Sequence, residues 1–228
     1  VSLSPVSPTT ISACSATSFC SGGSVTITAD SAYTSYLWSD NSIGSSITVS
    51  QAGIFSMSAV DANGCEYLSN SMPVTVNPNP VISLVSLNDE TCFGMNDGSI
   101  DINATNGTST YVYSWSNGSS TEDVSNLAAG NYSITVSDVN SCTATASYAI
   151  AAALPFSISV NSVNNVSYFG ANDGSIDISA IGGSSPYQFN WSSGNISSSI
   201  SNISAGNYSV TISDANNCTV DSSFVITE

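Results

Sequence analysis

One spacing recurs three times in this chain of 228 residues and limits how the chain can fold. After each of three tryptophans, a glycine follows at 15 residues, an aspartate at 23 and a cysteine at 27. The tryptophans are Trp38, Trp115 and Trp191, and the cysteines are Cys65, Cys142 and Cys218. The second and third copies align without a gap at an offset of 76. Spacing this regular indicates an array of similar structural units, and function is to be sought in the array.

Each copy consists of short segments in which apolar and polar residues alternate. In Ser24–Ala29, Val25 and Ile27 alternate with serine and threonine, as is typical of a strand with one buried face. Such segments recur at intervals of roughly 8–12 residues, separated by turn residues and without a helical period. The pattern predicts an all-β protein of three tandem Ig-like β-sandwich domains in a head-to-tail rod. The predicted domains are residues 1–78, 79–153 and 154–228.

Two kinds of aromatic residue are predicted to stabilise each sandwich. The tryptophan of each copy lies on the third strand, where an indole fills the space between two sheets. Tyr132 and Tyr208 match a tyrosine corner, in which the phenol hydroxyl binds the backbone a few residues upstream. The first copy has Phe55 at this place, so we expect a weaker corner there. A sugar-binding platform is the alternative interpretation of these aromatics, but their spacing favours the core.

The charge balance excludes several classes of function. The chain has 16 acidic residues, no Lys, Arg or His, and a net charge of −16. Without a cationic side chain, ion pairs between side chains and catalysis by His or Lys are impossible. A charge of this sign also repels nucleic acid and anionic lipid surfaces. The partners that remain are metal cations, basic proteins, neutral glycans and other copies of the chain.

Carboxylates are the only candidates for catalysis. Asp97, Asp101 and Asp138 could form a cluster for glycoside hydrolysis, which uses paired carboxylic acids. The same aspartates recur in tandem copies as turn and strand-face residues, and no cleft is implied. We therefore predict that the chain is not an enzyme.

The cysteine content indicates a location. Six cysteines among many short strands are typical of an oxidising, extracytoplasmic compartment. The apolar run from Ala149 to Leu154 is far too short to span a bilayer, so no membrane insertion is expected. No signal peptide is visible, and Val1 is expected to begin a processed chain or a fragment.

Several motifs resemble those of a known family. CFGMNDGSIDI from Cys92, YSWSNG, NLAAGNYSITVSD and the closing cysteine are similar to the SprB-type repeat of Bacteroidota surface adhesins. FCSGGSVTITA, YLWSD and VDANGC resemble the related PKD/Ig-like repeat of the same giant secreted proteins. The resemblance implies a cell-surface filament exported by the type IX system and used in gliding or attachment. It supplies no catalytic or ligand-contacting residue.

A calcium site is one hypothesis for the ends of the domains. Asn-Asp-Gly loops precede the second strand, and Asp-x-Asn turns join the last two strands, at opposite ends of each sandwich. In a head-to-tail array, a loop of one domain would approach a turn of the next, and oxygen ligands suit Ca²⁺. The candidate ligands are Asp97, Asp138, Asp173 and Asp214. The alternative is that these residues simply form good turns.

The cysteines admit two patterns of disulfides. Pairing within domains would join Cys20 to Cys65 and Cys92 to Cys142, but it leaves Cys14 and Cys218 alone. It must also bridge opposite ends of a sandwich, about 20 Å apart, whereas a disulfide needs Cα atoms within about 7 Å.

Pairing between domains avoids both difficulties, and we favour it. It joins Cys20 to Cys142 and Cys92 to Cys218, and it fits the presence of Tyr168 where the other copies have cysteine. Cys14 could then pair with Cys65, or Cys65 could bind a preceding domain. The pattern within domains stays open, because the loop from Asn88 to Gly98 is long enough to return along its own domain.

These observations predict a non-enzymatic structural or adhesive segment of an extracellular filament, in surface attachment or gliding motility. Its partners would be neighbouring copies or domains of the same filament, with surface glycans as a further possibility. No cofactor besides calcium is expected. Two alternatives stay open: a subunit of a homopolymeric filament, and a glycan-binding module.

Overall fold

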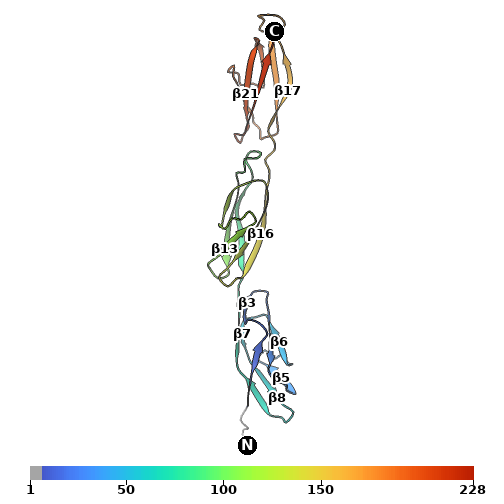
Figure 1. Cartoon of the computed structure of the whole chain (residues 1–228), viewed down its shortest axis with the longest axis vertical. Helices are drawn as coiled ribbons and strands as arrows, with labels where there is room; N and C mark the ends of the chain where they lie inside the picture. The colour runs from blue at the N-terminus through green and yellow to red at the C-terminus, as the bar shows by residue number, and fades with distance from the viewer. Residues whose placement is uncertain (1–6) are drawn as a thin grey trace. The chain divides into compact units, whose positions relative to one another are not determined.

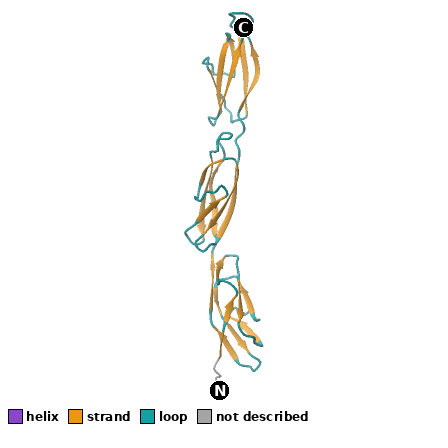
Figure 2. Cartoon of the chain, in the orientation of Figure 1, coloured by secondary structure: helices purple, strands orange, loops and turns teal. Residues whose placement is uncertain are grey.

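The computed structural model describes residues 7–228, and every regular element in that range is a β-strand (Figure 2). The sequence pattern of Val1–Cys14 predicts a leading edge strand, and the first six residues of this segment lie outside the described residues. Among the residues described, no helix is long and apolar enough to cross a membrane. The strands pair in three sets, residues 7–77, 80–150 and 157–226, which we call the first, second and third repeats (Figure 1).

The first repeat contains three small sheets, with strand orders β1-β9-β8-β5, β2-β4-β6 and β3-β10-β7. Its strands are β1 (Ser7–Thr9), β2 (Ile11–Ala13), β3 (Ser18–Cys20), β4 (Val25–Ala29), β5 (Ser35–Trp38), β6 (Ser46–Val49), β7 (Gly53–Phe55), β8 (Met57–Val60), β9 (Glu66–Ser69) and β10 (Met72–Asn77). The alternation in β4 has the expected result: Val25 and Ile27 are buried in one core with Trp38 and Met57.

The sequence pattern predicts one continuous strand over Ile54–Val60 and another over Tyr67–Val76, and this prediction is wrong. Each is interrupted, and its two halves join different sheets: β7 pairs with β10, whereas β8 pairs with β9 and β5. At the interruption the N–H of Met57 donates to the hydroxyl of Ser69 (2.8 Å). A side chain thus satisfies a backbone donor where the ladder breaks, and the strand can change sheets without leaving it unpaired.

The second and third repeats share one topology of two three-stranded sheets, β11-β12-β14 with β13-β15-β16, and β17-β18-β20 with β19-β21-β22. The second repeat contains β11 (Pro80–Asn88), β12 (Gly98–Asn106), β13 (Val112–Trp115), β14 (Val124–Leu127), β15 (Gly130–Ser137) and β16 (Thr143–Ile150). The third contains β17 (Ser157–Asn164), β18 (Gly174–Ile181), β19 (Gln188–Trp191), β20 (Ser199–Ile203), β21 (Gly206–Ser213) and β22 (Thr219–Ile226). The gapless alignment of the two sequences accounts for this shared topology.

The core of the third repeat shows why two sheets pack together. Ile176 and Ile178 project from β18 and Val210 and Ile212 from β21, and all four are at most 1% exposed. They share one cluster with Trp191, so the inward faces of both sheets contribute to the same core. An all-β sandwich of the Ig-like kind is therefore the fold of this repeat.

By compactness the chain divides differently, into two units. One unit contains the described residues up to Ser83 with Asn103–Ser120 and Ser133–Ala146. The other contains Leu84–Ile102, Thr121–Tyr132 and Ser147–Glu228. Strands of the second repeat contribute to both units, so the division into three domains stays a prediction.

Candidate functional site: two disulfide-bonded junctions

Two disulfides join successive repeats. Cys20 of the first repeat is bonded to Cys142 of the second, with Cα atoms 5.4 Å apart, and this bond lies within the first compact unit. Cys92 of the second repeat is bonded to Cys218 of the third, with Cα atoms 5.6 Å apart, within the second unit. These are the pairs favoured from the sequence, and the pattern within domains is not formed.

Strand pairing explains how the first cysteine of each pair reaches the next repeat. In the first repeat β3 runs parallel to β10, and Cys20 is level with Asn77, the last residue of that repeat. In the second repeat the N–H of Glu90 donates to the carbonyl of Ala151, just beyond β16 (3.3 Å). In both repeats, the loop that holds the first cysteine of the pair therefore lies beside the C-terminal end of its own repeat, where the next repeat begins. We call these segments the leading loops: Cys20–Ser24, Asp89–Asp97 and Asn165–Asp173.

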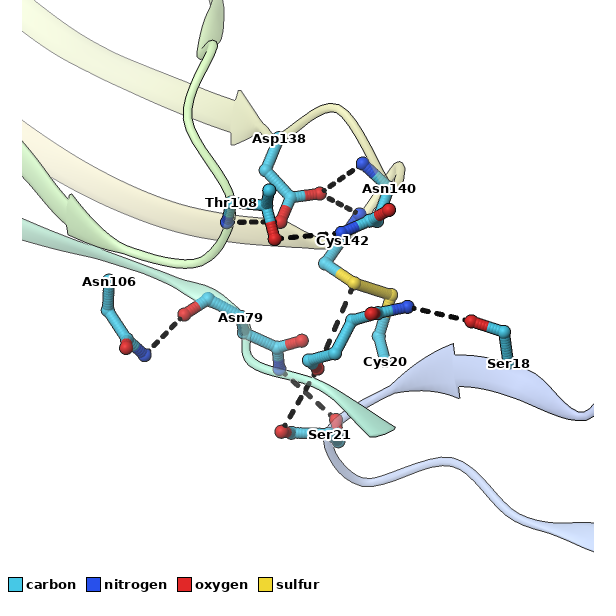
Figure 3. The surroundings of a disulfide bond; sticks show 10 residues. Ser18, Cys20, Ser21, Asn79, Asn106, Thr108, Asp138, Asn140 and Cys142 are labelled. Atoms are coloured by element: carbon cyan, nitrogen blue, oxygen red, sulfur yellow. Dashed lines mark hydrogen bonds between the residues drawn. A yellow bond between two sulfur atoms is a disulfide. The ribbon is translucent and has the colours of Figure 1, made fainter. Parts of the chain in front are cut away.

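The second cysteine of each pair is held by an aspartate at the start of the last hairpin turn. We call the equivalent segments Asp61–Cys65, Asp138–Cys142 and Asp214–Cys218 the Asp–Cys turns. In the second repeat Asp138 Oδ1 accepts from the N–H groups of Asn140 (2.9 Å) and Cys142 (2.8 Å) (Figure 3). Its Oδ2 accepts from the N–H of Thr108 (2.9 Å), so one carboxylate links two turns of the repeat.

The third repeat repeats this arrangement. Asp214 accepts from the N–H groups of Asn216 (2.8 Å), Cys218 (2.9 Å) and Ser184 (2.8 Å). Burial opposes ionisation of Asp138 and Asp214, but three N–H donors to each carboxylate outweigh it and lower the pKa of both. The ionised aspartates thus stabilise the turns that hold the bonded cysteines.

The residues between the first two repeats are fixed by hydrogen bonds on both sides (Figure 3). The carbonyl of Asn77 accepts from the N–H of Ser21 (2.8 Å), and the side-chain amide of Asn79 donates to the carbonyl of Ser21 (3.2 Å). The side-chain amide of Asn106 then donates to the carbonyl of Asn79 (2.8 Å). The alternating Asn and Pro residues at 77–80 predict a stiff linker, but its hydrogen bonds to both repeats have no signal in the sequence.

The junction between the second and third repeats uses the same parts. The Sγ of Cys218 lies 3.3 Å from the carbonyl oxygen of Thr91, and the amide of Asn216 reaches the same oxygen (3.5 Å). Gly182 has a positive φ, and a Cβ there would lie 1.8 Å from the carbonyl oxygen of Pro155. Only glycine lets the chain that enters the third repeat pass so close.

Of the two possibilities left open for Cys65, the bond to Cys14 is wrong, because both are exposed free thiols. In the parallel pair β1–β9, Ser7 is level with Tyr67. Cys65 therefore lies before this level and Cys14 well beyond it. The separation is about nine residues, or roughly 30 Å at ~3.3 Å per residue, far more than a disulfide spans.

The four candidate calcium ligands are all engaged in their own loops or turns. Asp97 accepts from the N–H of Thr91 (3.0 Å) and from its hydroxyl, and Asp173 accepts from the N–H of Ser167 (3.0 Å). In residues 7–228 no three His, Cys, Asp or Glu side chains gather as a metal site would require. An ion at the junctions would compete with N–H donors, and calcium binding stays a prediction.

The aromatic residues singled out from the sequence lie as follows. Trp38, Trp115 and Trp191 are at most 3% exposed. The hydroxyl of Tyr132 donates to the carbonyl of Ala128 (2.9 Å), and that of Tyr208 to the carbonyl of Ser204 (3.0 Å). These bonds span four residues and fix the turn before β15 and β21. Phe55 has no hydroxyl, so the first repeat lacks this bond.

The three carboxylates considered for glycoside hydrolysis have separate structural settings. Asp97 and Asp138 hold a leading loop and an Asp–Cys turn, as described above. Asp101 lies on β12, where burial and the neighbouring Asp123 raise its pKa. The carboxylate of Asp123 accepts from the N–H of Ile102 (3.1 Å), as expected of a group that fixes the sheet edge.

Comparison with known proteins gives a family match over part of the chain. The model of the SprB repeat matches residues 84–120 and 160–196, equivalent segments of the second and third repeats. No curated protein sequence matches the chain. The chain thus contains two SprB-type repeat segments, as the sequence motifs indicated.

Solved structures support the fold. The eight N-terminal Ig domains of Down Syndrome Cell Adhesion Molecule align with a TM-score of 0.55 at 11% identity, over 96% of this chain and 36% of that structure. Three N-terminal domains of the bacteriophage RB49 Highly Immunogenic Outer Capsid protein align with a TM-score of 0.36 at 14% identity, over 96% of each chain. A fragment of intimin, in complex with the intimin-binding domain of its receptor, aligns with a TM-score of 0.40 at 17% identity, over 71% of this chain and 69% of that one. The assignment of tandem Ig-like sandwiches rests on the first of these.

Proposed function

We propose that this chain is a non-enzymatic, tension-bearing segment of an extracellular surface filament used for attachment or gliding. The observation that carries the proposal is that successive repeats are bonded to each other by Cys20–Cys142 and Cys92–Cys218. A disulfide inside one sandwich would stabilise that sandwich alone. A disulfide between sandwiches limits how far they can separate, which matters when the chain is pulled.

Three further features support this function. The SprB repeat matches favour a repeat protein of the adhesin type. Disulfides persist in oxidising compartments, which favours a location outside the cell. The acidic, cation-free composition favours a well-hydrated surface without affinity for nucleic acid or anionic lipid. Export by the type IX system and a role in gliding come from the family resemblance.

The proposal is tested on the cells that make the protein. Antibodies against the chain should label fibres on intact cells in electron micrographs, and label restricted to permeabilised cells would contradict the proposal. Cells carrying Cys20→Ser with Cys142→Ser should detach from a surface at lower shear, at an unchanged amount of surface protein. The matched control is Cys14→Ser, which removes an exposed free thiol and should leave detachment unchanged.

The glycan-binding alternative is favoured by one surface of the first repeat. A groove of about 440 Å³ crosses the outer face of β5, β8 and β9, lined by Tyr36, Leu37, Ile43, Tyr67 and Leu68 among others. Leu37, Ile43 and Leu68 are each at least half exposed. Leu37 and Leu68 lie on one face of the sheet, on either side of Ser58, and an exposed apolar patch of this kind can bind a ligand such as a glycan. A glycan array probed with the native chain and with Leu37→Asp should show binding that the substitution removes.

A further inference from the structure

The Asp–Cys turn of the first repeat has the same internal hydrogen bonds as the two turns that hold disulfides. Asp61 Oδ1 accepts from the N–H groups of Asn63 (2.8 Å) and Cys65 (2.9 Å). These distances match those in the turns that end at Cys142 and Cys218. All three turns therefore present their cysteine from the same backbone conformation.

The three cysteines differ in what covers them. Cys142 and Cys218 are 1% and 9% exposed, and each is bonded to a cysteine in the leading loop of the preceding repeat. Cys65 is exposed and unbonded. In two of the three equivalent turns, the cysteine is thus bonded to a leading-loop cysteine, and in the third turn it is available for the same bond.

We propose that Cys65 is a covalent docking site for another repeat of the same kind, which contributes a cysteine from its leading loop. The cysteines in the chain's own leading loops, Cys20 and Cys92, are already bonded, and the third repeat has Tyr168 at this position. The partner repeat therefore lies outside these three, in the same polypeptide or in another molecule of the protein.

The bond forms by thiol–disulfide exchange. The two thiols lose two protons and two electrons, and a new Sγ–Sγ bond joins them. A disulfide-bearing oxidant accepts the electrons and protons and leaves as a dithiol. Oxidants of this class maintain disulfides in compartments outside the cytoplasm.

Tyr168 determines in which direction repeats can be linked by disulfides. A cysteine in the Asp–Cys turn lets a repeat form a disulfide with the repeat before it. A cysteine in the leading loop lets a repeat form a disulfide with the repeat after it. The third repeat has the turn cysteine and lacks the loop cysteine. Covalent linkage can therefore extend from the first repeat through Cys65 and does not extend from the third.

The test is disulfide mapping of the protein purified from the cells that make it. Free thiols are alkylated, the protein is digested with thermolysin because no Lys or Arg serves trypsin, and peptides are identified by mass spectrometry. We expect Cys65 in a disulfide with a leading-loop cysteine of another repeat, and Cys14 alkylated. Recovery of Cys65 as an alkylated thiol, or bonded to Cys14, would overturn the proposal.

Cys14 is an internal control for oxidation that does not depend on a docked repeat. A hydrogen bond with the backbone of Thr26 lowers the pKa of its thiol, which favours reaction with any oxidant. Oxidation without a docked partner would therefore modify Cys14 as well as Cys65. Non-reducing electrophoresis of Cys65→Ser separates the two sources: loss of a dimer places the partner on a second molecule, and an unchanged mass places it on the same polypeptide. This mapping is independent of the adhesion assay, so either proposal can fail alone.

Discussion

The order of the bonded cysteines sets how far the chain can be stretched. Along the sequence they come as Cys20, Cys92, Cys142 and Cys218, and the bonds join the first to the third and the second to the fourth. The two bonds therefore cross in the sequence. Even after every strand has unfolded, the shortest covalent route crosses from Cys20 to Cys142, returns along the backbone to Cys92, and crosses again to Cys218.

That route contains about 50 residues and extends to about 170 Å at ~3.4 Å per residue. The reduced chain between Cys20 and Cys218 contains about 200 residues and extends to about 680 Å. Reduction should therefore lengthen the fully unfolded chain by about 500 Å, measured by pulling its two ends in optical tweezers.

Serine variants distinguish crossed bonds from separate ones. With Cys20→Ser and Cys142→Ser the shortest route becomes the backbone from Cys20 to Cys92, about 72 residues, so the chain gains only about 75 Å. With Cys92→Ser and Cys218→Ser the gain is about 90 Å, and only all four substitutions give the full 500 Å. Bonds within domains, Cys20–Cys65 and Cys92–Cys142, would give other values. The first pair of substitutions would then break both bonds and lengthen the chain by about 320 Å, whereas the second pair would break one bond and lengthen it by about 170 Å, and these gains would refute the reasoning.

Three further predictions concern stability. Tyr132→Phe removes one hydroxyl bond and should lower the free energy of unfolding by about 1 kcal/mol or less, measured by urea unfolding, whereas the exposed Tyr168→Phe should change nothing. Asp138 and Asp214 have lowered pKa values in the folded chain, so their contribution to stability is complete above the unfolded pKa of about 3.9 and is lost as the pH falls through the folded pKa. The melting temperature should therefore decrease when the pH is lowered below about 4, and a constant melting temperature in that range would contradict this. Calcium at the junctions predicts a higher melting temperature in calcium than in chelator, and identical curves would remove the hypothesis.

Local patterns in the sequence predicted the features that depend on local physics. Alternation identified β4 because one face of the strand is buried and the other is more exposed. The Asp–Cys turns were recognisable because Asp, Asn and Gly suit such turns. The favoured disulfides followed from strand length, since the two ends of a sandwich are too far apart for one bond, and from the cysteines that pairing within domains leaves alone.

The failures concern choices made between distant segments. Nothing in Ile54–Val60 indicates that its halves join different sheets, because that depends on which strand lies opposite each half. The sequence left open a bond between Cys14 and Cys65, because the parallel pairing of β1 with β9, which separates these residues, is not encoded in either segment. The hydrogen bonds of Asn79 and Asn106 could not be predicted from the sequence. The third repeat has Gly182 at the position of Asn106, so no repeated pattern marks these residues.

The crossed bonds also bear on what happens when the backbone is cut. Cys20, Cys92, Cys142 and Cys218 bound three intervals, and each interval alone completes a covalent connection between the two ends of the chain. One cut in any interval leaves the ends connected, and so do two cuts in different intervals. Only a cut in all three separates them. For a chain that works outside the cell, as proposed above, exposure to proteases is a constant risk. A cut in one interval, or one cut in each of two intervals, would leave its two ends covalently connected.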